Sequence, residues 1–160
     1  MSVAFTREES AETAAAVELP DRSISPHPNL VTQSGLKALN AAMEAARAAY
    51  HSSQQIEDLN ERRSASAAAS RDMRYFAERL RTAQLMPARA EGEKVAFGSR
   101  VMFVRDDGKP QTFRIVGEDE ADPRAGSISY VSPVARALIG AAAGDRAVLG
   151  DHEIEVLAIK

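Results

Sequence analysis

The sequence contains no cysteine and no tryptophan, and aromatic residues make up only 5% of its 160 positions. Without cysteine the protein has no disulfide bond, thiolate nucleophile or cysteine-ligated zinc site. The small number of rings excludes a core built mainly on aromatic side chains. The three histidines, His27, His51 and His152, are far apart in the sequence and predict neither a metal site nor a histidine general base.

Long apolar runs are also lacking, and none approaches the roughly 18 residues of a membrane span. The start of the chain has neither the basic nor the apolar stretch of a signal peptide. There is no glycine-rich phosphate loop and no nucleophile-elbow serine, which weakens nucleotide-binding and hydrolase interpretations. The formal net charge of −3 argues against a protein held on nucleic acid by charge alone. We therefore expect a soluble cytoplasmic protein without a membrane partner.

Helix-breaking residues divide the chain into three segments. Of the nine glycines only Gly35 precedes Gly92, and no proline lies between Pro28 and Pro87. Residues 36–86 thus contain neither glycine nor proline, and all of these helix breakers lie on either side of them. The predicted domains are residues 1–31, 32–87 and 88–160.

The first segment, residues 1–31, has a net charge of −3, three prolines and few large apolar side chains. Such a composition buries too little apolar area to offset the entropy lost on ordering the chain. We expect a disordered N-terminal tail. The alternative is a segment that becomes ordered on a partner through Leu19, Ile24 and Leu30.

The second segment, residues 32–87, has apolar residues at alternating spacings of three and four, as in coiled coils. Two series occur: Leu36, Leu39, Met43, Ala46 and Tyr50, then Ala69, Met73, Phe76, Leu80 and Ala83. We predict an antiparallel coiled-coil hairpin that reverses near Leu59 and Asn60, with arms of about 25 residues and about 37 Å. Serine and alanine crowd its distal half, so that half should fray more readily than the base. A dimeric coiled-coil scaffold is an alternative.

The third segment, residues 88–160, changes to a period of two, which is typical of strands with one buried face. Asp106-Asp107-Gly108 has the composition of a hairpin turn. Ser132 and Pro133 predict the start of a short helix, and Gly140 predicts its end. The predicted class is α+β: a helical hairpin followed by a small antiparallel sheet packed on one helix.

Two acidic clusters are candidates for a site. Glu118, Asp119, Glu120 and Asp122 end a predicted strand, where they form a cation site, a solvated loop or a face for a basic partner. At the predicted hairpin tip the acidic residues are Glu57, Asp58 and Glu61. They either favour the start of the second helix or are carboxylates carried by the hairpin to a distant site.

The third segment resembles the C-terminal domain of the bacterial Gre transcript-cleavage factors, GreA and GreB. The resemblance lies in Phe97-Gly98, FRIVGEDEAD at 113–122, the strand at 128–131, SPVARALIG at 132–140 and Gly144-Asp145. In the hairpin it lies in Thr32, Gly35 and Leu36 at the start and in Leu80, Ala83 and Gln84 at the end.

The resemblance implies an FKBP-like C-terminal domain that docks beside the secondary channel of RNA polymerase, with the coiled coil inserted into the channel. The protein would be a monomer, any RNA contact would be secondary, and it would not itself be an enzyme. It needs no cofactor, because the magnesium used in cleavage is held by the polymerase. The docking residues implied by the family motif are Asp119, Ser132, Pro133, Val134, Ala135 and Arg136.

The hairpin departs from the pattern of cleaving members of the family. Their tip pattern has no clean match in SSQQIEDLNERR, and the arms are shorter by about one heptad, or about 10 Å. Glu57, Asp58 and Glu61 would then lie outside ligand distance of the catalytic metal, so we expect weak or no stimulation of cleavage. A peptidyl-prolyl isomerase or peptide-binding module is the alternative that FKBP-like topology suggests.

Overall fold

The computed structural model describes residues 19–88 and 92–160. The chain divides into two compact units. One, the helical unit, contains Ala41–Glu78 together with the described residues 19–24. The other, the sheet unit, contains Ser25–Asn40 and Arg79–Lys160. No helix among the residues described in these units is both long enough and apolar enough to cross a membrane.

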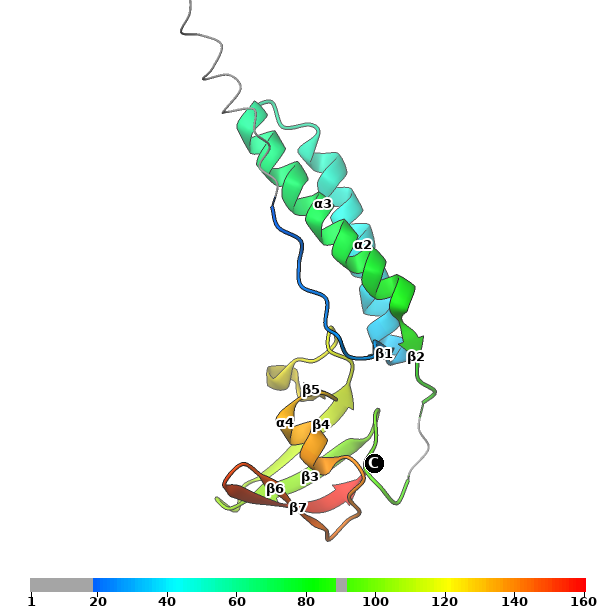
Figure 1. Cartoon of the computed structure of the whole chain (residues 1–160), viewed down its shortest axis with the longest axis vertical. Coiled ribbons are helices and arrows are strands. Elements are labelled where there is room, and N and C mark those ends of the chain that lie inside the picture. Colours follow the sequence, from blue (N-terminus) through cyan, green and yellow to red (C-terminus); the bar gives the residue numbers. More distant parts are fainter. Residues whose placement is uncertain (1–18, 89–91) are drawn as a thin grey trace, which may run out of the picture. The chain divides into compact units, whose positions relative to one another are not determined.

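Two long helices form the predicted hairpin (Figure 1). Helix α2 is Gln33–Ser53, with 21 residues, and α3 is Leu59–Thr82, with 24. The chain reverses between Ser53 and Leu59, so the turn predicted near Leu59 and Asn60 lies a few residues too far along the sequence. Helix α2 is also shorter than the expected 25 residues. The reason is that Asp58 caps α3: its Oδ1 accepts a hydrogen bond of 2.8 Å from the backbone N–H of Glu61.

The seam of the helical unit contains few large buried side chains. Its buried apolar residues within the described chain are Met43, Ala46 and Ala69, at 6–7% exposure. Near the turn a hydrogen bond of 2.8 Å joins the hydroxyl groups of Ser53 and Ser66. A polar pair thus accompanies the small side chains at the distal end, and the greater fraying expected there stays a prediction.

Of the predicted disordered tail, residues 1–31, the structure describes residues 19–31, where side-chain contacts hold part of the chain. Residues 1–18 lie outside the described residues, so the prediction stays open there. Within the helical unit, Asp21 forms a 2.7 Å ion pair with Arg74, and the Arg22 guanidinium lies 3.7 Å from the centre of the Tyr75 ring. Ion pairing and cation–π attraction order a segment that has little apolar area of its own.

A two-stranded parallel sheet, absent from the sequence prediction, joins β1 (Leu30–Val31) to β2 (Gln84–Leu85) inside the sheet unit. The backbone of β1 also passes against Gly117, where any side chain would collide with the carbonyl oxygen of Leu30. Only glycine permits this close approach.

The main sheet has five strands: β3 (Arg100–Arg105), β4 (Pro110–Val116), β5 (Ser127–Ser129), β6 (Arg146–Leu149) and β7 (His152–Ile159). Their order is β5-β4-β3-β7-β6, and the turn between β3 and β4 lies at the predicted Asp106-Asp107-Gly108. All pairs are antiparallel except β4–β5, which is parallel. The expectation of a purely antiparallel sheet is therefore wrong at this edge, because the chain returns through a 3₁₀ turn, η1 (Pro123–Ala125), before it enters β5.

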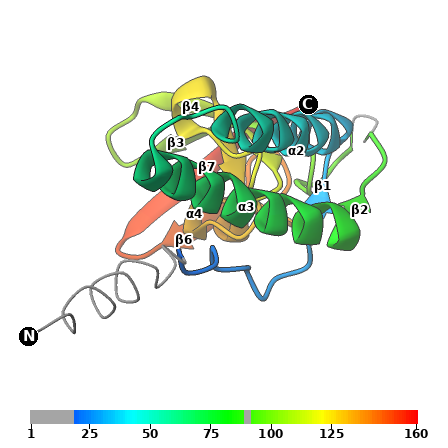
Figure 2. The same ribbon diagram turned by 90° about the horizontal axis from the view of Figure 1, so that it is seen from above.

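Helix α4 (Pro133–Leu138) packs on this sheet and completes the core (Figure 2). The largest fully buried side chains are Phe103, Ile115, Leu138, Ile154, Val95, Val101, Val116 and Val156. The pairing shifts register between Met102 and Phe103, whose partners on β7 are Ala158 and Val156, so Leu157 is left over as a bulge. This bulge explains why the alternation in the sequence breaks before Ile159. The predicted α+β fold is confirmed.

Candidate functional site

The first candidate surface is the start of α4. Ser132 is the N-cap, and its hydroxyl accepts a hydrogen bond of 3.2 Å from the backbone N–H of Ala135. Pro133 occupies the first helical position, where its missing N–H costs nothing, and Gly140 follows the helix with φ of +90°. The boundaries predicted from these three residues are confirmed.

The residues predicted for docking divide by exposure. Pro133 and Arg136 are exposed, and Ser132 and Val134 are partly buried. Ala135 is 0% exposed and packs in the core, so it cannot contact a partner. We call Ser132, Pro133, Val134 and Arg136 the α4 surface.

The chain before β1 adds residues that the sequence prediction missed. Nη2 of Arg136 lies 3.4 Å from Nε2 of His27. The hydroxyl of Tyr130 donates a hydrogen bond to the carbonyl oxygen of Pro28. These contacts join positions more than 100 residues apart, and no local pattern in the sequence predicts them.

The acidic cluster at the end of β4 contacts the chain's own residues. Arg79 of α3 has a side chain only 3% exposed, and its Nε lies 2.5 Å from Oδ2 of Asp119. Its Nη2 lies 4.0 Å from Oε2 of Glu118. The carboxylate of Asp119 is therefore already paired, which leaves its predicted role in docking a prediction.

Glu120 and Asp122 are engaged as well. Glu120 accepts hydrogen bonds of 2.5 Å from the hydroxyl groups of both Thr32 and Ser34, at the start of α2. Asp122 caps η1 by accepting from the backbone N–H groups of Arg124 and Ala125. In the part of the chain that the structure describes, no group of three or more histidine and carboxylate residues could hold a metal ion. The acidic residues of this cluster therefore stabilise the structure around them by accepting hydrogen bonds from the start of α2 and from η1.

Burial, followed by the neighbouring carboxylate of Glu118, raises the pKa of Tyr130 above its ordinary value of 10.0. The guanidinium groups of Arg79 and Arg136 act in the opposite direction. The phenol therefore stays protonated at neutral pH, as its hydrogen bond to the carbonyl oxygen of Pro28 requires.

The second candidate site is the hairpin tip. Asp58 serves as the cap of α3, whereas Glu57 and Glu61 are exposed. Arg62 donates a hydrogen bond of 3.3 Å to the carbonyl oxygen of Ile56 across the turn. The cap accounts for one carboxylate of the three, and the role of the tip in distant chemistry stays a prediction.

Comparison with known proteins decides the family. A family model described as transcription elongation factor, GreA/GreB, C-term, matches residues 90–160. The GreA of Alkalilimnicola ehrlichii is 39% identical over 107 residues, which cover 58% of this chain and 68% of that protein. The chain belongs to the GreA/GreB family.

Two further similarities complete the comparison of this GreA/GreB family member. The GreB of Neisseria meningitidis serogroup B is 42% identical over 96 residues, or 56% of this chain and 59% of that protein. The crystal structure of the GreA factor homolog Gfh1 of Thermus thermophilus shares 21% identity at a TM-score of 0.39, covering 84% of this chain and 99% of that one. The chain spans only 46% of the GreA of Sphingopyxis alaskensis, so its alignments with the curated relatives are partial.

Proposed function

We propose that this protein binds RNA polymerase and regulates transcription elongation. The observation that supports it most directly is the α4 surface, within the segment that matches the GreA/GreB family model. Ala135 and Leu138 anchor the helix in the core, while Pro133 and Arg136 face outward. A rigid helix end with one apolar and one cationic side chain is suited to a protein partner.

The charge of the α4 surface supports a choice of partner element. The carboxylate of Asp119 is paired with Arg79, with its side chain 18% exposed, whereas Arg136 of the α4 surface is an exposed cation. We therefore propose that the surface meets an acidic element at the rim of the polymerase's secondary channel.

The helical hairpin is proposed to enter that channel without completing the chemistry. Helix α2, at 21 residues, is about 31 Å long. One tip carboxylate, that of Asp58, is used as a helix cap. On this proposal the protein is a cytoplasmic monomer that is not an enzyme, stimulates transcript cleavage weakly or not at all, and leaves the magnesium to the polymerase.

The docking experiment is co-purification of the full chain with core RNA polymerase, comparing two charge reversals. Arg136→Glu should lower the affinity by about tenfold or more, because it removes a cation and places an anion against the acidic element. Lys109→Glu reverses an exposed charge in the turn between β3 and β4 and should leave binding unchanged. Equal binding by both variants would overturn the docking surface, and absence of the polymerase from the wild-type eluate would overturn the function.

The cleavage experiment uses a backtracked elongation complex and the double variant Glu57→Ala with Glu61→Ala, which leaves the Asp58 cap in place. Wild type and variant should both give cleavage near the rate of the polymerase alone. Strong stimulation by the wild type that the double variant loses would contradict the proposal and assign the tip a role at the metal.

The isomerase alternative gains no support from the aromatic residues. Phe103 is fully buried and stacks on Phe113 at 6.1 Å between ring centres, so these rings belong to the core. An isomerase assay on a proline-containing model peptide should show no turnover.

A further inference from the structure

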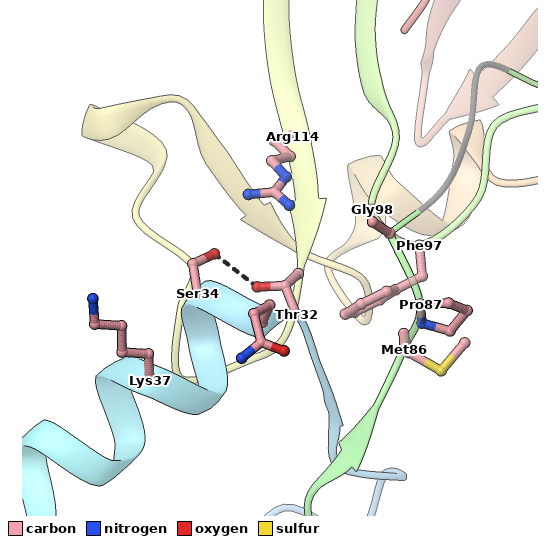
Figure 3. A pocket seen from close by; sticks show the side chains of 10 residues that line it. Thr32, Ser34, Lys37, Met86, Pro87, Phe97, Gly98 and Arg114 are labelled. Atoms are coloured by element: carbon pink, nitrogen blue, oxygen red, sulfur yellow. Dashed lines mark hydrogen bonds between the residues drawn. The ribbon is translucent and has the colours of Figure 1, made fainter.

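A cavity of about 450 Å³ lies within the sheet unit and shares no residue with the α4 surface. Its walls come from the start of α2, the chain after β2, the turn before β3 and the strand β4 (Figure 3). The volume falls in the range of small-molecule sites and is too small for a folded partner.

The charged lining of the cavity is entirely positive. Lys37 and Arg114 line it, and no acidic residue does so among the described residues. Neither cation forms an ion pair with any described residue, although the protein as a whole has a net charge of −3. Two unpaired cations at one cavity of an acidic protein point to an anionic ligand.

The remaining lining is largely apolar and includes an aromatic ring. Phe97, Met86 and Pro87 form this part, and in Figure 3 the Phe97 ring points from its backbone towards the side of Thr32. The ring is held by an edge-on contact with Tyr130, at 5.8 Å between centres. A fixed ring beside apolar side chains suits a flat heterocycle, because every nucleobase has a face that stacks on an aromatic ring.

The hydroxyl groups at the cavity are not donors for an anion. Thr32 and Ser34 line the cavity, and both donate their hydroxyl hydrogens to the carboxylate of Glu120, which is not itself a lining residue. Their oxygens can therefore only accept, and the groups that line the cavity and can bind an anion are Lys37 and Arg114.

We infer that this cavity binds a nucleoside diphosphate, with the base against Phe97 and the two phosphates on Lys37 and Arg114. The ligand class follows from the pairing of two cations with one ring. A sequence motif could not show it, because the cations come from α2 and β4, far apart in the chain, and no glycine-rich loop takes part.

The test is a fluorescence titration of the full chain with an N-methylanthraniloyl derivative of GDP, competed with unlabelled GDP. We expect saturable binding that GDP displaces. Lys37→Gln and Arg114→Gln should each weaken it by about tenfold, because each removes one charge-assisted hydrogen bond. Lys109→Gln removes an exposed cation outside the cavity and should bind as the wild type does.

Competition with inorganic pyrophosphate and with an acidic peptide separates the alternatives. Phe97→Leu should weaken GDP while leaving pyrophosphate unchanged, and thermal unfolding of that variant checks that it folds. The inference is overturned if the wild type shows no saturable binding, if the double variant Lys37→Gln with Arg114→Gln binds as the wild type does, or if pyrophosphate or the peptide competes as well as GDP.

Discussion

The two units of the chain reach their folded state by different means. In the sheet unit, Phe103, Ile115 and Leu138 are all 0% exposed, and burying one such side chain contributes about 1.5 to 3 kcal/mol. Among the described residues of the helical unit, three apolar side chains are buried, and two of these are alanines, whose burial contributes far less. The sheet unit is therefore held by a tertiary core, whereas the helical unit depends on helix hydrogen bonds, caps and a few side-chain pairs. A chain of this kind should open locally in its helices before its sheet unfolds.

The largest expected difference between the two units comes from removing an aromatic ring from the core of the sheet unit. Phe103→Ala should lower the free energy of unfolding by about 3 to 5 kcal/mol, because the cavity it leaves adds to the lost burial. Met43→Ala, in the helical unit, should cost about 2 kcal/mol, because Met43 has alanines as its buried apolar companions. Urea titration followed by circular dichroism measures both. Equal losses would show that the two units do not differ in packing.

The buried charge of Arg79 gives the next effect. Arg79→Met should destabilise the protein by about 2 to 3 kcal/mol, because the partly buried side chains of Asp119 and Glu118 lose the guanidinium of Arg79. The matched control is Arg63→Met, an exposed position on the same helix, with an expected change below about 0.5 kcal/mol.

A rescue experiment isolates that ion pair. Adding Asp119→Asn to Arg79→Met removes the carboxylate charge that faced the guanidinium and should restore about half of the loss. A double variant as unstable as Arg79→Met alone would show that packing of the long side chain, and not its charge, is what matters.

Much of the fold could be predicted from local signals in the sequence. Ser132, Pro133 and Gly140 place α4 correctly, because caps and turns depend on neighbouring residues. The pairing of β1 with β2 was missed, because strands of two residues have no periodicity. The parallel placement of β5 was missed as well, because it depends on where the chain goes after η1 and not on the strand's own residues.

The candidate site was less predictable, because its contacts join distant positions. Arg79 and Asp119 are 40 residues apart, and nothing around either residue marks the pair. Ala135 was assigned to docking as part of a motif, yet its side chain belongs to the core. A motif identifies a segment, whereas burial decides which side chains a partner can reach.

Removing the caps of α4 and α3 tests the same difference between the units, with a smaller expected loss of stability. Ser132→Ala and Asp58→Ala each remove a hydrogen bond to a helix N-terminus, worth about 1 kcal/mol. In the sheet unit the loss should appear in global unfolding. At the end of the helical unit it should appear mainly as faster amide hydrogen exchange in the first turn of α3. Ser132→Thr and Asp58→Asn retain a capping oxygen and serve as controls, and identical global losses for the two alanine variants would contradict the contrast.

The smallest effect concerns how the chain before β1 is held. In the sheet unit, Tyr130 donates its hydroxyl to the carbonyl of Pro28, whereas in the helical unit Asp21 relies on an exposed ion pair with Arg74. Tyr130→Phe should cost below about 1 kcal/mol at neutral pH. Because the pKa of Tyr130 is raised in the folded state, its stabilisation is fully present below about pH 10 and is lost as the pH rises through that higher value. The difference in the free energy of unfolding between wild type and Tyr130→Phe, measured by urea titration, should therefore shrink at alkaline pH. Added salt should weaken the ion pair of Asp21 with Arg74 but should leave the difference between wild type and Tyr130→Phe unchanged. A difference that is constant above pH 10 would show that the phenol does not hold the segment by its proton.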